Sequence, residues 1–438
     1  GLLSTFEIDG VLHIDIHHEL QAEYAVRLLR KMQLSAAATS TETARRWHGI
    51  FVSSYLDRME GSQKIKFHDP VQSYAFDKLI HHMIKARMYD EAVMRLQDEH
   101  FIIERIEVMK WEKAISSLVA DCAALKKAMR KDNTIDKNPY DTITTTYLNL
   151  GKCIAKYGKS IGKKPETASA LHSIGFSLAE IGQYADAISQ YKTALEMVAK
   201  SSIIAGTILY SCCVVYLIQR DYEKVSKNVK ECIKVINEND KNSELYAEAL
   251  MLKAEAMMLD HDYQGAMEFF NFSLEALSKN STNKRVQIGI VLGRQGHLYQ
   301  LLGEIDNAHE ALSKCIEWKE KISESSFDLA GVYNFMGDVC VLRGNRKDAL
   351  LYFDLAYRMY ESHMEKELRE EYEIEIHILN GKTDNLNDDK EGCYENFDIA
   401  IETMKRSQRP NKRTIYNLQV MARTYAKIED QNMAMKLL

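Results

Sequence analysis

The residues of this chain that could do phosphate chemistry fall short of a complete set. Gly158, Lys159 and Ser160 stand in the order that ends a phosphate-binding P-loop. That loop also requires a strand in front of it and a glycine at position 153, and this position holds Cys153. We therefore interpret the match as a chance one. The sequence predicts no nucleotide site in this part of the chain.

Histidine and cysteine chemistry is equally incomplete. The histidine pairs His17–His18 and His81–His82 are neighbours on predicted helices, where adjacent side chains point about 100° apart, so neither pair is expected to hold zinc. The 8 cysteines form no CxxC pair and are expected to be reduced core residues. No Ser-His-Asp, Cys-His or paired-carboxylate set stands out. The sequence favours a binding protein over an enzyme.

A repeated pattern of small and aromatic residues dominates the rest of the chain. Residues 171–195 carry Gly175, Gly182, Ala187 and Tyr191, and residues 333–357 carry the same residue types at the same spacing. Small residues at these offsets let two antiparallel helices approach closely, and the aromatic ring fills the gap. The pattern resembles the tetratricopeptide (TPR) repeat, a helix pair that buries its apolar face by stacking on its neighbours. The resemblance implies an all-α fold, an α-solenoid.

The turn between the two helices of each pair sets the period. The position of Gly182 recurs at intervals of 38 to 44 residues, against roughly 34 in the standard repeat, which predicts long helices of a roughly 42-residue type. The chain is predicted to contain six to seven repeats. The later copies of this position are Arg220, His261, Gly303, Gly344, Asp388 and Glu429. The sixth repeat departs most, because residues 380–392 are polar and are predicted to form a loop.

Candidate ligand contacts flank the first small residue of each repeat. In TPR arrays this part of the first helix lines a concave groove. The candidate partner-binding residues are His172, Phe176, Tyr210, Glu255, Arg294, His297, Asn334 and Asp338. They combine rings, an amide and both signs of charge, and could clamp an extended peptide by hydrogen bonds to its backbone. The alternative is that each is an ordinary solvated helix position.

The chain before the repeats is organised differently. Residues 2–16 alternate in polarity around a turn at Asp9-Gly10, which predicts a β-hairpin, and a helix follows at about 18–32. Residues 34–160 are predicted to be helical without the repeat pattern, and one of these helices is expected to span about 101–129. We expect three parts: residues 1–33, a helical arm at 34–160, and the TPR superhelix at 161–438.

Two blocks in the first two parts resemble one known family. Residues 16–24 read IHHELQAEY, and residues 74–108 carry His82, Ala86-Arg87, Glu99-His100-Phe101 and Ile106 in a characteristic order. The first block resembles the end of the winged-helix domain in the apoptotic protease-activating factor family of STAND-class signalling ATPases. The second is similar to the helical arm that follows it. TPR repeats would then stand in the position of the sensor.

The resemblance implies a nucleotide-switched protein. Its ATPase core would lie upstream of residue 1, bind ADP or ATP, and face this chain as a partner domain. By motif position, His18 would contact the nucleotide's phosphate in the intact protein. The chain would sense a peptide or protein ligand through its groove and could oligomerise on activation. We expect it to be part of a longer protein.

Two other interpretations of the function remain open. A constitutive TPR scaffold or adaptor, of the kind used in cytoskeletal or ciliary assembly, would need no switch, and a peptide receptor that regulates an enzyme is a third possibility. The formal net charge of −6 gives no reason to expect nucleic acid as a partner. No run of about 18 apolar residues predicts a membrane span, and a cytoplasmic location is expected.

Overall fold

The computed structural model describes most of the chain as helices. The described residues are 3–8, 11–16, 70–132, 139–219, 221–240, 243–278, 285–321, 327–367 and 370–406, with scattered positions in 45–56 and 418–435. The chain divides into two compact units, Gly1–Val198 and Ala199–Leu438, which we describe separately. This division tests neither of the predicted boundaries, which stay predictions.

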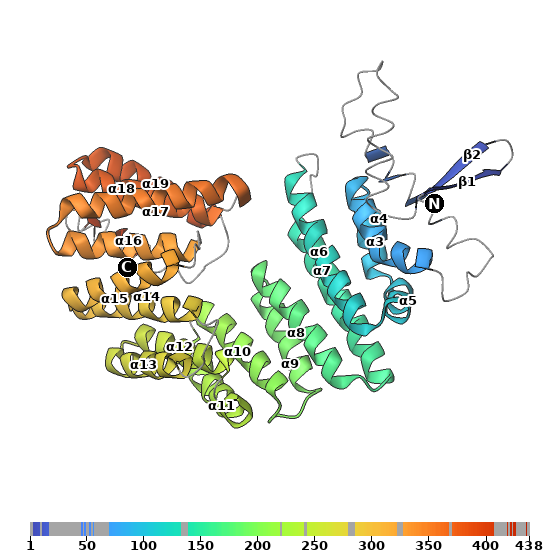
Figure 1. Ribbon diagram of the computed structural model, residues 1–438, viewed down its shortest axis with the longest axis horizontal. Coiled ribbons are helices and arrows are strands. Elements are labelled where there is room, and N and C mark those ends of the chain that lie inside the picture. The colour runs from blue at the N-terminus through green and yellow to red at the C-terminus, as the bar shows by residue number, and fades with distance from the viewer. Residues whose placement is uncertain are drawn as a thin grey trace, which may run out of the picture. The chain divides into compact units, whose positions relative to one another are not determined.

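The first unit begins with a hairpin and continues as helices (Figure 1). Strands β1 (Leu3–Ile8) and β2 (Val11–Ile16) pair antiparallel, with Leu3 opposite Ile16 and Ile8 opposite Val11, which confirms the predicted hairpin. The helices are α3 (Pro70–Lys85), α4 (Tyr89–Gln97), α5 (Glu99–Met109), α6 (Trp111–Lys131), α7 (Pro139–Ser160), α8 (Lys164–Glu180) and α9 (Tyr184–Leu195).

One prediction for this unit is wrong. A single helix was expected over residues 101–129, but the backbone breaks at Lys110, whose φ of 70° lies in the left-handed region. Residues 99–109 and 111–131 therefore form separate helices, α5 and α6, and both pack against α3.

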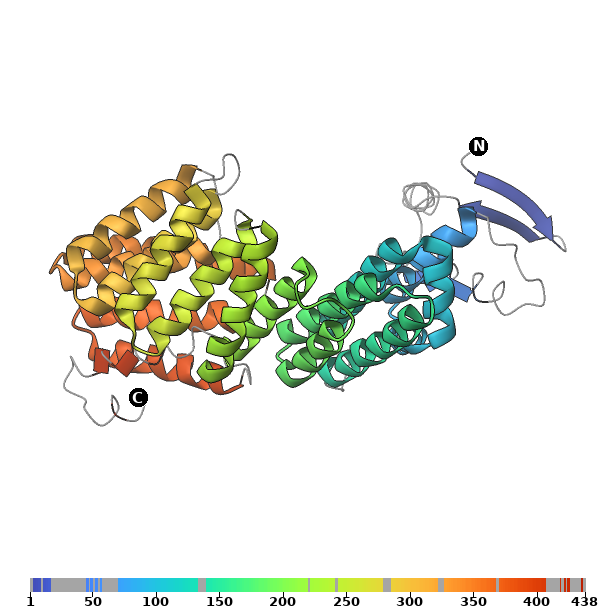
Figure 2. The ribbon, with the colours of Figure 1, turned by 90° about the horizontal axis from the view of Figure 1, so that it is seen from below.

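The second unit is a series of antiparallel helix pairs. Its helices are α10 (Ile203–Ile218), α11 (Tyr222–Asp240), α12 (Glu244–Leu259), α13 (Tyr263–Ser278), α14 (Arg285–Leu302), α15 (Ile305–Lys321), α16 (Phe327–Leu342), α17 (Arg346–Glu367), α18 (Glu370–Leu386) and α19 (Lys390–Arg406). We call the first helix of each pair the A helix and the second the B helix. Each B helix packs on its own A helix and on the next one, so the pairs stack in chain order (Figure 2).

The small and aromatic residues of the repeat explain this packing. A Cβ atom at Gly175 would lie 2.5 Å from Cε1 of Tyr191, and one at Gly296 would lie 2.6 Å from Cγ of Leu312. Gly337 is similarly close to Phe353. The first helix of the pair must therefore have glycine at these positions, because any larger residue would clash with the ring or leucine of the second helix. This confirms the expected role of the repeat positions.

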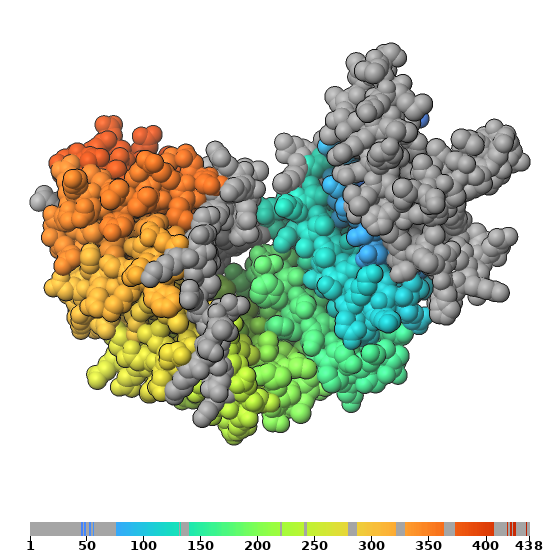
Figure 3. Space-filling view, in the orientation of Figure 1, coloured from blue at the N-terminus to red at the C-terminus, as the bar shows by residue number. Residues whose placement is uncertain are grey.

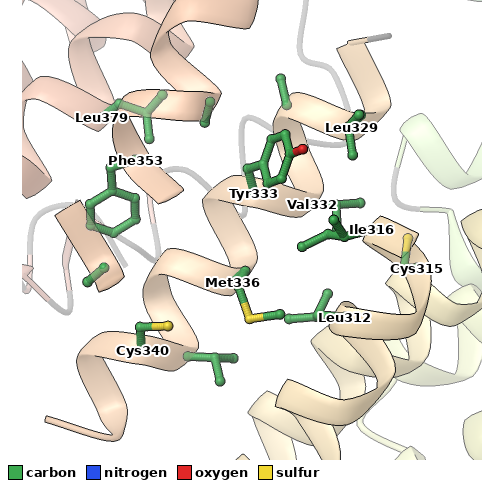
Figure 4. Packing of buried hydrophobic residues seen from close by; sticks show 14 of the residues in the cluster. Leu312, Cys315, Ile316, Leu329, Val332, Tyr333, Met336, Cys340, Phe353 and Leu379 are labelled. Carbon is green, nitrogen blue, oxygen red and sulfur yellow. The ribbon is translucent and has the colours of Figure 1, made fainter. Parts of the chain in front are cut away.

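One buried hydrophobic cluster extends across neighbouring repeats. Leu312 of α15, Met336 of α16, Phe353 of α17 and Leu379 of α18 belong to one buried hydrophobic cluster (Figure 4). All 8 cysteines are free thiols and buried, as predicted. Cys315 also links the two helices of its pair, because its Sγ donates a hydrogen bond to the carbonyl of Gly289 on α14 at 2.9 Å.

The sixth repeat is more regular than the sequence suggested. The expected polar loop at 380–392 is wrong, because α18 runs to Leu386 and α19 begins at Lys390. Gly381 packs against Phe397 as the equivalent glycines do in other repeats. Polar residues remain helical here because the packed residues keep their repeat positions.

Candidate ligand-binding face

Six of the predicted groove residues lie on A helices of the second unit and are joined by side-chain contacts from one A helix to the next. We call this set of contacts the A-helix line. It comprises Tyr210, Glu248, Glu255, Arg294, His297, Asn334, Phe335, Asp338 and Lys382. The repeats that carry it follow one another in chain order from yellow-green to orange-red in Figure 3.

The line begins between α10 and α12. The Tyr210 phenol and the Glu248 carboxylate interact electrostatically. Burial raises the pKa of Tyr210, and the charges of Glu248 and Glu255 raise it further, so the phenol stays a neutral donor. Burial also raises the pKa of Glu248, with a smaller contribution from Glu244. Carboxylates thus dominate this end of the line.

The next contact joins α12 to α14. Arg294 Nε lies 3.0 Å from Glu255 Oε1, and the two side chains are 38% and 9% exposed. The carboxylate is enclosed while the guanidinium remains accessible. The pair therefore holds a cation at the surface of the face by a nearly buried acid.

An aromatic contact joins α14 to α16. The rings of His297 and Phe335 are stacked with centroids 4.8 Å apart and planes inclined by 12°. His297 is nearly buried, and Phe335 is half-buried. Phe335 therefore presents part of an apolar ring between two polar contacts.

The last contact joins α16 to α18 through Lys382, which is not among the predicted groove residues. Lys382 Nζ donates to Asn334 Oδ1 at 2.6 Å and lies 2.8 and 2.9 Å from the two oxygens of Asp338. The ammonium also lies 5.2 Å from the centre of the Phe353 ring, and the side chain is 5% exposed. The predicted contacts Asn334 and Asp338 are thus already engaged within the protein.

Lys382 was missed because residues 380–392 were expected to form a loop. The signal was present: Lys382 follows Gly381 as Asp338 follows Gly337 and Glu255 follows Ala254. Aligning the sixth repeat by its small residue would have placed Lys382 on the same face.

The other predicted sites lie apart from this line. His172 and Phe176 are on α8, in the first unit: His172 contacts the Tyr191 ring and burial lowers its pKa, whereas Phe176 is 54% exposed. His18 lies outside the described residues. Gly158–Ser160 form the last turn of α7 rather than a phosphate loop.

Metal and membrane features can be stated for the described part of the chain. His82 Nδ1 lies 2.6 Å from His48 Nδ1, yet the described residues contain no group of three or more His, Cys, Asp or Glu suited to a metal ion. No helix among them is both long enough and apolar enough to cross a bilayer.

Comparison with known proteins agrees with this architecture. The family model described as "Tetratricopeptide repeat" matches residues 291–322, which include most of α14 and α15. No protein among the curated ones matches the chain.

Among solved structures, aspartyl phosphate phosphatase F from Bacillus subtilis is similar, with a TM-score of 0.53 and 12% identity over 86% of this chain and 94% of that one. A Rap protein complexed with Competence and Sporulation Factor has a TM-score of 0.52 and 12% identity, over 84% of this chain and 95% of that one. At such identities the likeness shows the fold alone. The chain is an all-α solenoid, a helical-repeat protein that contains a TPR repeat.

Proposed function

We propose that the second unit binds an extended peptide or protein segment along the A-helix line. The observation that carries this proposal is the continuity of the line: polar or aromatic contacts link α12, α14, α16 and α18 in turn, and Tyr210 of α10 interacts electrostatically with Glu248 of α12. Burying charged groups costs free energy that apolar packing would not. Their placement on successive A helices therefore favours a face shaped for a partner.

The kinds of exposed group on this face support a peptide ligand. Arg294 offers hydrogen-bond donors, Phe335 offers part of a ring, and the half-buried Glu248 carboxylate can accept hydrogen bonds. An extended chain presents donors, acceptors and side chains at regular intervals, which suits such a mixed surface. The Rap protein complexed with Competence and Sporulation Factor shows that a solenoid of similar fold can hold a factor.

A photo-crosslinking experiment tests the proposal. Peptides selected from a random library on the full chain would be resynthesised with a benzophenone side chain, irradiated, and mapped by mass spectrometry. We expect crosslinks on α12, α14 and α16. Crosslinks confined to the B helices α13, α15 and α17 would contradict the proposal.

We further propose that this sensor belongs to a cytoplasmic nucleotide-switched protein, whose upstream domain binds ADP or ATP. This part rests on the family resemblance of residues 16–24 and 74–108. The constitutive scaffold is the alternative. The discriminating observation is the coding sequence upstream of residue 1: a strand followed by GxxxxGK[ST] supports the switch. A longer protein without that motif supports the scaffold.

A further inference from the structure

Arg294 and Lys382 are the two cations of the A-helix line, and they differ in what they can still bind. The Lys382 ammonium has three donors, and it contacts three acceptor oxygens: one on Asn334 and two on Asp338. Its side chain is 5% exposed. Lys382 therefore holds α16 to α18 and has no donor left for a ligand.

Arg294 has donors to spare. A guanidinium carries five N–H donors in a planar fork, and one carboxylate takes at most two of them. Among the described residues, Glu255 is the partner of Arg294, through Nε. At 38% exposure, the remaining donors are open to a molecule on this face.

The geometry points to Arg294 as the residue that recognises the ligand, and to a carboxylate as the ligand group that it binds. This inference rests on the proposed function. Glu255 acts as a positioning residue, because its nearly buried carboxylate fixes the Nε edge and leaves the terminal nitrogens for a second carboxylate. A planar carboxylate matches that edge with two parallel hydrogen bonds.

The charge of Glu255 does not prevent this binding. A ligand carboxylate on the far edge of the guanidinium would lie about twice as far from Glu255 as from Arg294. Coulomb energy falls in inverse proportion to distance, so the repulsion is roughly half the attraction. Short charge-assisted hydrogen bonds to the guanidinium add to the attraction.

The carboxylate could belong to an Asp or Glu side chain or to the C-terminus of a peptide, and three octapeptide libraries separate these sources. The first contains acidic residues and has amidated C-termini, the second lacks acidic residues and has free C-termini, and the third lacks both. Retention on the immobilised full chain would be measured for each. We expect the first or the second to be retained about tenfold more than the third, as a charged hydrogen bond implies.

Matched variants assign the effect to Arg294. Arg294→Gln should abolish the preference for carboxylates. Arg343→Gln should keep it, because Arg343 is similarly exposed, at 41%, and pairs with Asp306, but outside the A-helix line. Circular dichroism would verify folding. Arg294→Lys keeps a cation beside Glu255 without the fork and should retain carboxylate libraries several-fold less than the wild type.

The outcomes separate this inference from the proposed function. Equal retention of all three libraries, a preference that survives in Arg294→Gln, or undiminished retention by Arg294→Lys would overturn the carboxylate assignment while peptide binding stands. If no library binds the wild-type chain, the proposed function fails and this inference fails with it.

Discussion

Arg105 in the first unit and Arg294 in the second are both held by a carboxylate from another helix, yet their surroundings give them different roles. Arg105 is fully buried: its Nη2 contacts Asp121 Oδ2 at 2.7 Å and Ser117 Oγ at 2.6 Å, and Ser117 in turn donates to Asp77. Arg294 is 38% exposed. Enclosure limits Arg105 to joining α3, α5 and α6, whereas exposure leaves Arg294 able to bind a partner.

The largest expected effect comes from comparing how much Arg105 and Arg294 contribute to the free energy of unfolding. Arg105→Met should lower the free energy of unfolding by about 3–5 kcal/mol, because Asp121 would be left buried without its cation. Arg294→Met should cost less, about 1–2 kcal/mol, because water can reach this pair. Urea denaturation of the full chain measures both. Equal losses would mean that exposure does not separate the two roles.

Lys382 tests whether a buried cation within the A-helix line behaves like Arg105. Lys382→Met should cost about 2–4 kcal/mol, since Asn334 and Asp338 lose the ammonium they share. Lys314→Met is the control, because Lys314 is 55% exposed and pairs with Glu310 one turn away on the same helix. A loss as small as that of the control would show that Lys382 does not hold α16 to α18.

Acidification should affect the first unit through His82. Burial, followed by the charges of His48, His81 and Lys78, lowers the pKa of His82 to about 3. The unfolded chain, with a histidine pKa near 6.5, binds more protons between these values, so stability falls as the pH drops below about 6.5. One histidine shifted this way costs about 2 kcal/mol at pH 5.

Urea denaturation of wild type and His82→Gln at pH 7 and pH 5 measures this loss. The variant should lose less stability on acidification than the wild type does. Asp121 acts in the opposite direction, since burial raises its pKa to about 6 and favours the folded state as the pH falls toward 4. Identical pH dependence in both proteins would remove His82 as the cause.

The smallest expected effects lie in the turns of the second unit. Gly303 and His261 occupy equivalent turns with φ of 77° and 64°, a region that favours glycine. A Cβ at Gly303 would meet no atom within 4 Å, so Gly303→Ala should cost about 1 kcal/mol through backbone strain alone. His261→Gly relieves the same strain but loses the contact of His261 Nδ1 with the Tyr263 hydroxyl, 3.0 Å away, so it should gain no more than about 0.5 kcal/mol. Thermal melting measures both variants. A stabilising Gly303→Ala would contradict the turn assignment.

These turns also show what the sequence could predict. The repeat spacing located the left-handed turns at Gly182, Gly303 and Gly344, and even at His261 and Asp388, because a fixed period and a fixed helix pair demand the same backbone each time. The groove residues were predicted by the same alignment, and six of them do meet in the A-helix line. Local polarity gave a wrong prediction at 380–392, where a loop was expected and most residues are helical.

Contacts between distant residues could not be predicted in this way. Arg105 and Asp121 lie on α5 and α6, and their spacing in the sequence does not indicate that α3 packs against both helices. Lys382 reaches back to Asn334, 48 positions earlier in the chain. Such pairs depend on side-chain reach and enclosure, which emerge from packing rather than from a repeat.

The affinity of one selected peptide for two single variants tests whether the A-helix line is the ligand-binding face. Phe335 lies on α16 within the line, and Leu351 is 53% exposed on the B helix α17. Fluorescence anisotropy should show that Phe335→Ala weakens binding at least tenfold, since a buried ring contributes well over 1 kcal/mol, while Leu351→Ala leaves it unchanged. Loss of binding in Leu351→Ala with none in Phe335→Ala would contradict this assignment.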